Sequence, residues 1–163
     1  RRQVDEIFRF LKKYVPGCED ARLLCSGSTL GIRESRHIHG EKTLTLEDII
    51  EGRTPHDSVL VCSNSADIHG RFGPKSNDYV VIQNGDWYGI PYGCLVPQRI
   101  DGLLLAGRCF SATSDAAGAV RVMPPCMCMG QAAGIAAQCM NPRNIQPAQV
   151  RETLRQQGAF LPD

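Results

Sequence analysis

The chain opens with apolar and charged side chains arranged with the period of an α-helix. Its apolar residues share the spacing of one helix face: Val4, Ile7, Phe8, Leu11, Tyr14 and Val15. Charged side chains occupy most of the positions between them, and Pro16-Gly17 follows at once. This pattern predicts an amphipathic helix that ends at the proline and turns one face toward an apolar partner.

The middle of the chain carries short apolar runs of the kind that form strands. We expect extended segments at residues 22–25, 29–38 and 59–62, and a hairpin in which 79–82 pairs with 87–90. The stretch Ser63–Asp78 contains glycines and a proline and predicts a loop.

Two helices are marked by their end signals. Thr45 and Asp48 have the spacing of an N-cap and its reciprocal partner, and Gly52 stands where such a helix would end. Gln146-Pro147 marks the start of a final helix that we expect to stop at Gly158.

The last third of the chain combines a short apolar strand with a long apolar helix. Leu103–Ala106 predicts a strand buried on both faces, and Ser111–Gly118 predicts a second turn-rich stretch. Cys126–Met140 is rich in glycine and alanine and predicts a helix. Because this helix has no polar side, we expect it to be buried all round.

This strand–helix unit also suggests chemistry. Gly107 closes the strand, so the backbone can approach another group closely there. The helix that follows directs free N–H groups and a partial positive charge beyond its first turn, which suits an anion or a carbonyl oxygen. The pattern fits a buried helix packed on a strand without any ligand equally well.

Composition and charge exclude several classes of protein. The 163 residues are 42% hydrophobic and 21% charged with a formal net charge of +1, which is ordinary for one globular domain. Lys and Arg form no basic cluster, so a nucleic-acid partner is not expected. No apolar run is long enough to span a membrane, and no signal peptide opens the chain. The chain begins without Met, as a fragment would; its compartment stays open, with the cytoplasm as our default expectation.

The eight cysteines predict free thiols. Most of them lie in apolar stretches, where a thiol behaves as a small hydrophobe that we expect to be buried. No CxxC pair occurs, and the four histidines do not combine with the cysteines at zinc-ligand spacing, so we expect no metal site. A zinc site and a reactive thiol pair remain the alternatives.

Several segments together resemble a known family. They are Leu104–Thr113 and Arg121–Gly134, preceded in order by Gly31–Arg36 with Gly40, by Asp67–Gly70 and by Ile90–Pro97. They resemble the C-terminal part of FAD-dependent oxidoreductases of the FAD-oxidored type, within the glutathione reductase-like flavoprotein superfamily. The resemblance runs over roughly residues 22 to 160.

This resemblance implies FAD as the cofactor and assigns residues to it. Gly107 and Arg108 match positions beside the ribityl and phosphate region of the flavin. Arg108 stands where many relatives have an acidic residue; it could pair with a phosphate oxygen, or else form a salt bridge. Arg121, Val122 and Met123 match the positions whose backbone N–H groups face the flavin's pyrimidine carbonyl.

The resemblance also implies that part of the site lies elsewhere. The superfamily binds the ADP half of FAD through a G-x-G-x-x-G loop, and these 163 residues contain none. We therefore expect a C-terminal fragment that binds FAD weakly or not at all without its missing N-terminal FAD-binding portion. Another chain that covers exposed sheet edges, as in an oligomer, is a further expected partner.

The resemblance gives the expected fold as α+β or α/β. It comprises an antiparallel substrate-side sheet and the terminal strand–helix unit of an FAD-binding Rossmann-like domain. We divide the chain into an N-terminal helix and strand at 1–27, a substrate-side β-rich region at 28–97, and a flavin-facing region at 98–163.

Other residues are candidates for the substrate side. His69 is the candidate catalytic acid or base, with an ordinary hydrogen-bonded loop residue as its alternative. Arg33, together with Glu34 and Arg36, fits a salt-linked network or a site for a substrate anion. Tyr88 and Tyr92 could line the substrate face of the flavin or pack in the core.

The leading hypothesis for function is an enzyme whose full-length parent transfers hydride between FAD and a small organic substrate. A non-catalytic binding or assembly module without flavin is the first alternative. A redox protein that uses two of its cysteines is the second.

Overall fold

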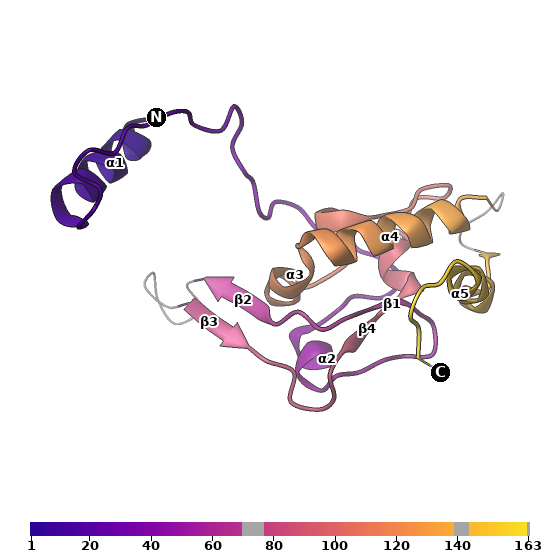
Figure 1. Ribbon diagram of the computed structural model, residues 1–163. Helices are drawn as coiled ribbons and strands as arrows, with labels where there is room; N and C mark the ends of the chain where they lie inside the picture. Colours follow the sequence, from indigo (N-terminus) through magenta and orange to yellow (C-terminus); the bar gives the residue numbers. More distant parts are fainter. Residues whose placement is uncertain (70–76, 139–143, 163) are drawn as a thin grey trace. The chain divides into compact units, whose positions relative to one another are not determined.

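The computed structural model describes residues 1–69, 77–138 and 144–162. It divides into two compact units, Arg1–Ile32 and Arg33–Asp163 (Figure 1). Within the described residues, no helix combines the length and the apolar character that crossing a membrane requires.

The first unit contains α1 (Arg2–Tyr14), which confirms the predicted N-terminal helix. Arg2 Nε lies 2.9 Å from Glu6 Oε1 and links successive turns. Lys12 and Lys13 stand in the last turn, where positive charge interacts favourably with the helix dipole. None of its residues is buried, so the predicted apolar face meets no partner within this unit.

The strands expected at residues 22–25 and 29–38 are wrong, because no residue of either stretch belongs to a strand. An apolar run becomes a strand only when a neighbouring strand accepts its backbone hydrogen bonds. Leu24 is 93% exposed, and no such neighbour lies beside it within Arg1–Ile32.

The second unit begins its regular structure at α2 (Leu46–Ile50), and here the sequence prediction is confirmed. The Thr45 side chain accepts a hydrogen bond from Asp48 N, and the Asp48 carboxylate accepts one from Thr45 N at 2.9 Å. Gly52 follows with φ of +63°, a conformation that favours glycine. A Cβ at Gly52 would stand 1.8 Å from Asn84 O, so the helix end is also a close backbone contact.

Four short strands form two separate antiparallel pairs. β1 (Ser58–Cys62) pairs with β4 (Tyr88–Pro91), and β2 (Ala66–His69) pairs with β3 (Asn77–Val80). The strand expected at 59–62 is thus confirmed as β1. The small α+β fold is also confirmed.

The predicted hairpin between 79–82 and 87–90 is wrong. Tyr79 pairs with Asp67, whereas Ile90 pairs with Leu60. β4 is buried along its whole length, so it pairs with the similarly buried β1 in the core. The loop expected over Ser63–Asp78 is wrong in part, because β2 and the start of β3 lie within it.

Among the described residues, three helices and two 3-10 turns complete the unit. They are η1 (Tyr92–Leu95), η2 (Gly107–Cys109), α3 (Ser114–Val120), α4 (Met123–Ala136) and α5 (Pro147–Gln156). α5 confirms the predicted last helix. α4 packs on β1, η2 and α5, and α3 packs on β2 (Figure 1).

Two predictions for this region are wrong. Leu103–Ala106 is not a strand; Leu105 N donates a hydrogen bond to Leu95 O at 2.8 Å, but no ladder forms. The turn-rich stretch Ser111–Gly118 contains most of α3 instead, because the Thr113 hydroxyl accepts a hydrogen bond from Ala116 N and starts a helix there.

α4 is buried on one face only, which corrects the expectation of a fully buried helix. Met129, Ala132 and Ala136 are in the core, whereas the Met123 and Met127 residues are 79% and 73% exposed. α4 also begins at Met123, earlier than predicted, because its two prolines occupy the first turn, where their missing N–H groups cost nothing.

The core lies between the β1–β4 pair and the helices packed on it. Its largest fully buried side chains include Tyr88, Phe110, Ile49 and Ile90. Arg151 is buried as well, and its guanidinium donates to Ser58 O and Pro162 O. This arginine therefore links the C-terminal tail to β1 through backbone acceptors.

The cysteines confirm part of the sequence prediction. Every cysteine in the described residues is a free thiol. Cys62 and Cys94 are buried, but Cys25 and Cys128 are exposed, so the expectation of general burial is wrong. Cys139 lies outside the described residues.

Candidate functional site

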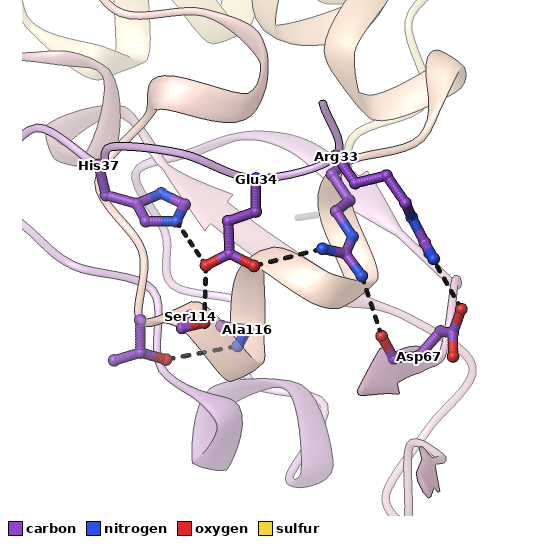
Figure 2. Close-up of polar contacts among 8 residues, drawn as sticks. Arg33, Glu34, His37, Asp67, Ser114 and Ala116 are labelled. Atoms are coloured by element: carbon purple, nitrogen blue, oxygen red, sulfur yellow. Dashed lines mark hydrogen bonds and ion pairs between the residues drawn. The ribbon is translucent and has the colours of Figure 1, made fainter. Parts of the chain in front are cut away.

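A carboxylate at the start of the second unit collects side chains from distant parts of the chain (Figure 2). Glu34 Oε1 accepts one hydrogen bond from Ser114 Oγ at 2.6 Å, and it also lies 3.2 Å from His37 Nε2. Its second oxygen accepts a hydrogen bond from Arg121 Nη1 at 3.2 Å. We call Glu34, His37, Ser114 and Arg121 the Glu34 cluster.

The charge state of Glu34 follows from these neighbours. Partial burial opposes ionisation, but the hydrogen bonds from Ser114 and His37 and the positive charges of His37 and Arg121 outweigh it. The pKa of Glu34 is therefore lowered from its ordinary value. The carboxylate is ionised at neutral pH.

His37 lies between two hydrogen-bond acceptors. Its Nδ1 is 3.3 Å from Phe110 O, and its Nε2 faces the Glu34 carboxylate. Because a carbonyl oxygen can only accept, Nδ1 is the donor in the first contact. Both ring nitrogens are thus engaged, and His37 joins Glu34 to the turn around Phe110.

Arg121 is held where α3 ends. It is the C-cap residue of α3, and its side chain is 11% exposed. Nη1 donates to Glu34 and Nη2 donates to Asp67 O at 3.3 Å. Its Nε is buried without a hydrogen-bond partner, and Arg33 closes the group with an ion pair to Asp67 Oδ2 at 3.1 Å. A buried donor without an acceptor is unusual in a folded protein and fits a site that takes an additional acceptor.

The first turn of α4 continues directly from Arg121. Val122 is the N-cap and Met123 the first helical residue, and both are exposed. Pro124 and Pro125 have no N–H group, and Cys126 N donates to Val122 O at 3.3 Å. Met123 is therefore the one residue of the first three helical positions that can offer an N–H to a ligand.

A cavity of about 450 Å³ lies beside this turn. The end of β1 and the two residues after it form one wall, and the beginning of α4 forms the other; the lining is Val61, Cys62, Ser63, Asn64, Val122, Pro124, Pro125 and Cys128. The Asn64 amide is held by Ala119 O at 2.7 Å. The cavity is thus mainly apolar with few polar groups, as small-molecule sites commonly are.

The second predicted cofactor segment lies next to α4. Gly107 opens η2 with φ of +75°, and a Cβ built on it would be 4.0 Å from Cys126 Sγ. Arg108 is exposed. In the folded chain Gly107 therefore lies next to the beginning of α4, although α3 separates the two in the sequence.

The remaining predicted site residues do not join this group. Arg36 is exposed, whereas Tyr88 and Tyr92 are both buried in the core. Burial, and then the neighbouring Cys62, raises the pKa of Tyr88, whose hydroxyl donates to Cys62 Sγ at 3.2 Å. His69 ends β2, and its side chain lies outside the described part of the structure.

Sequence reasoning did not find two members of the Glu34 cluster. Ser114 belongs to a stretch that reads as turns, and His37 was placed on a strand that does not form. The signal that was present is the density of charged residues beginning at Arg33, which indicated a network without its partners. Within the described residues, no group of three or more histidine, cysteine or acidic side chains could hold a metal ion.

Comparison with known proteins decides the family. A family model described as FAD dependent oxidoreductase matches residues 1–158. The chain belongs to this family of FAD-dependent oxidoreductases. No curated protein and no solved structure matches the chain.

The family implies FAD, and the residues of this FAD-dependent oxidoreductase fit one part of that cofactor. The buried Arg121 Nε lacks an acceptor, Met123 is exposed at the start of α4, and a Cβ at Gly107 would meet only Cys126 Sγ, in the first turn of α4. These features fit carbonyl and phosphate groups of a flavin nucleotide. The glycine-rich loop that would hold the ADP half is not among these residues.

Proposed function

We propose that this chain is the C-terminal part of an FAD-dependent oxidoreductase that transfers hydride between FAD and a small organic substrate. The observation that carries the proposal is the proximity of Gly107 to Cys126 in the first turns of α4. Gly107 thus lies beside the first turn of α4, the helix that begins at Met123. Family membership supports the cofactor.

Each residue of this chain has a distinct role in the proposal. Bound FAD supplies the hydride acceptor or donor. Gly107 leaves room for the cofactor beside the backbone, and Arg108 pairs with a phosphate oxygen. Val122 and Met123 present backbone N–H groups to a carbonyl, and the Arg121 guanidinium favours negative charge on the reduced cofactor.

The ADP half of FAD requires another part of the same protein. A pyrophosphate is usually held by a glycine-rich loop before a helix, and the sequence printed here contains no such loop. The proposal therefore divides the site between this chain and an N-terminal FAD-binding portion. In that arrangement the extended segment Leu103–Ala106 would join the sheet of a Rossmann-like domain.

The substrate side is assigned to the arginines near Glu34. Arg36 is exposed and free of the core, and Arg33 extends to Asp67 beside the cluster. Arg33 is already paired with Asp67, so Arg36 is the exposed cation that would favour a substrate carrying a negative charge. Tyr88 and Tyr92 are buried in the core, so neither is assigned to the substrate side.

Titration with FAD tests the divided site. We expect the 163-residue chain to show no sub-micromolar quenching of flavin fluorescence. A longer protein that includes a glycine-rich loop should be yellow, with absorption near ~450 nm. Tight binding by this chain alone would contradict the division, and a longer protein that binds no FAD would contradict the enzyme.

A matched pair of variants tests the assignment of Arg108. In the longer protein, Arg108→Gln should weaken FAD binding about tenfold, since it removes one charge-assisted hydrogen bond. Arg99→Gln removes the same charge from another exposed position and should leave binding unchanged. Equal affinities for the two variants would remove Arg108 from the site.

A further inference from the structure

One short segment touches both parts of the site that we assign to the flavin. On one side, Ile38 N donates to Cys109 O at 3.1 Å and His37 Nδ1 lies 3.3 Å from Phe110 O. On the other side, Glu34 binds Ser114 and Arg121. Residues 34–38 therefore connect the η2 turn with the α3–α4 corner.

We propose that Glu34 and His37 are positioning residues that clamp the η2 turn and Arg121 in one fixed arrangement. We call residues 34–38 the clamp. The effect of the clamp on FAD binding rests on the proposed function. The hydrogen bonds that form the clamp all lie within this chain. The sequence suggested a salt network or an anion site for Glu34 and no such role for His37.

Glu34 can act as the centre because both of its oxygens are engaged. Oε1 takes the Ser114 hydroxyl and the His37 ring, and Oε2 takes the guanidinium. The partners lie 80 and 87 residues away along the chain. The carboxylate is 27% exposed, so solvent weakens these charge-assisted bonds less than it would on an open surface.

His37 extends the clamp to the second segment. Its two nitrogens bridge a side-chain carboxylate and a backbone carbonyl, so its ring has no nitrogen left for a substrate. Loss of the Glu34 charge would weaken one end of this bridge. The effect should therefore reach Phe110 as well as Arg121.

If the clamp holds, weakening it should increase local opening of the η2 turn and of the α3–α4 corner together. If Glu34 only stabilised the end of α3, its loss would affect Arg121 and leave the η2 turn unchanged. Glu34→Gln is a suitable probe because it keeps the shape. It also removes the negative charge that Arg121, Ser114 and His37 face, so the charge-assisted hydrogen bonds are replaced by weaker neutral ones.

Amide hydrogen exchange of this chain, measured by NMR, separates the two cases. The reporters are the amides of Ile38 and Phe110 on one side and of Arg121 on the other, which donate to Cys109, Gly107 and Ala117 respectively. We expect Glu34→Gln to raise exchange at all three about tenfold. Glu47→Gln, which removes an exposed carboxylate from α2, should change none of them.

A result in which only Arg121, or none of the three amides, exchanges faster would overturn the clamp. The Leu60 amide in β1 serves as the remote reference, because a general loss of stability would affect it equally. If Glu34→Gln does not fold, Ser114→Ala removes a single donor and should still accelerate exchange at both segments by a smaller factor.

The same variant separates the clamp from the proposed function. In a flavin-loaded longer protein, Glu34→Gln should shift the flavin absorption spectrum and weaken FAD binding, and Glu47→Gln should do neither. Coupled loosening in this chain, with no FAD bound by the longer protein, would support the clamp and contradict the proposed function. If Glu34→Gln accelerates exchange at only one of the two segments and the longer protein binds FAD normally, the clamp is contradicted and the proposed function is supported.

Discussion

Ser114 Oγ donates a hydrogen bond to Glu34 Oε1 at 2.6 Å, although 80 residues separate the two. Ser114 is the first residue of α3, and Glu34 lies outside any helix or strand. Their contact places a carboxylate where the guanidinium of Arg121 can also reach it. The position of Glu34 is thus set by its partners and not by local secondary structure.

The lowered pKa of Glu34 gives a prediction for acid stability. The pKa of Glu34 in the folded state lies below its ordinary value, so the ionised carboxylate stabilises the fold above that ordinary pKa. This contribution is lost as the pH falls through the folded-state pKa. As the pH falls below the ordinary pKa of a glutamate, we expect the free energy of unfolding to decrease more steeply in the wild type than in Glu34→Gln. Urea unfolding at several pH values measures it.

The control for this pH experiment is Glu47→Gln. Glu47 is exposed in α2 and lies outside the Glu34 cluster, so this variant should keep the steep acid limb of the wild type. If the free energy of unfolding falls equally steeply with acid in the wild type and in Glu34→Gln, other carboxylates cause the acid sensitivity.

The start of α2 offers a test of local stability. Thr45 and Asp48 form a reciprocal capping box, in which each side chain binds the other residue's backbone N–H. Thr45→Ala should lower the free energy of unfolding by about 1 kcal/mol. Thr29→Ala, at an exposed position in the first unit, should leave it unchanged. Chemical denaturation monitored by circular dichroism compares the two, and equal midpoints would contradict a stabilising cap.

The thiols should differ strongly in reactivity. Burial, more than any other effect, raises the pKa of Cys94 to about 12, and Cys62 is also buried. We expect Cys25 and Cys128, which are exposed, to react with iodoacetamide at least about tenfold faster than these two. Peptide mass spectrometry after brief labelling reads out each site. Rapid labelling of Cys94 without denaturant would show that the core opens easily.

Gly89 is a position where an added methyl group should destabilise the fold. A Cβ there would lie 2.3 Å from Ser58 Oγ, on the paired strand. Gly89→Ala should therefore cost about 1–3 kcal/mol through overpacking. Gly130→Ala, on α4 with nothing within 4 Å of its Cβ, should instead stabilise by about 0.5–1 kcal/mol.

A second substitution sharpens the Gly89 test. The Ser58 hydroxyl is buried without a hydrogen-bond partner, so Ser58→Ala should be neutral or stabilising. Combined with Gly89→Ala, it should recover part of the lost stability, since it removes the atom that the new methyl group meets. Strict additivity of the two changes in unfolding midpoint would argue against the predicted clash.

The helices whose signals are local were predicted well. α1, α2 and α5 follow from helical spacing, a capping box and an N-terminal proline. In each case the residues that decide the structure lie within a few positions of one another. The strand pairing was not predictable in this way: Tyr79 and Ile90 are near neighbours in the chain but pair with different strands.

The candidate site shows the same division. The sequence predicts a cofactor role for Gly107, Arg108 and Arg121–Met123 through the resemblance of their segments to a flavoprotein family, and it indicates a charged region around Arg33 and Glu34. It did not link Glu34 to Ser114 or His37 to Phe110, because neither pair shares a helix turn or a strand. Such contacts depend on how separate elements pack, and no local pattern encodes that packing.

By itself, the sequence determined the family, the absence of a glycine-rich loop from these residues, and the helices with strong end signals. Only the tertiary structure decided that β4 pairs with β1, that α4 is exposed on one face, and that Glu34 binds Arg121. The physical reason is distance along the chain. Caps and helical faces depend on interactions over three or four residues, whereas an ion pair over 87 residues exists only after the whole unit has folded.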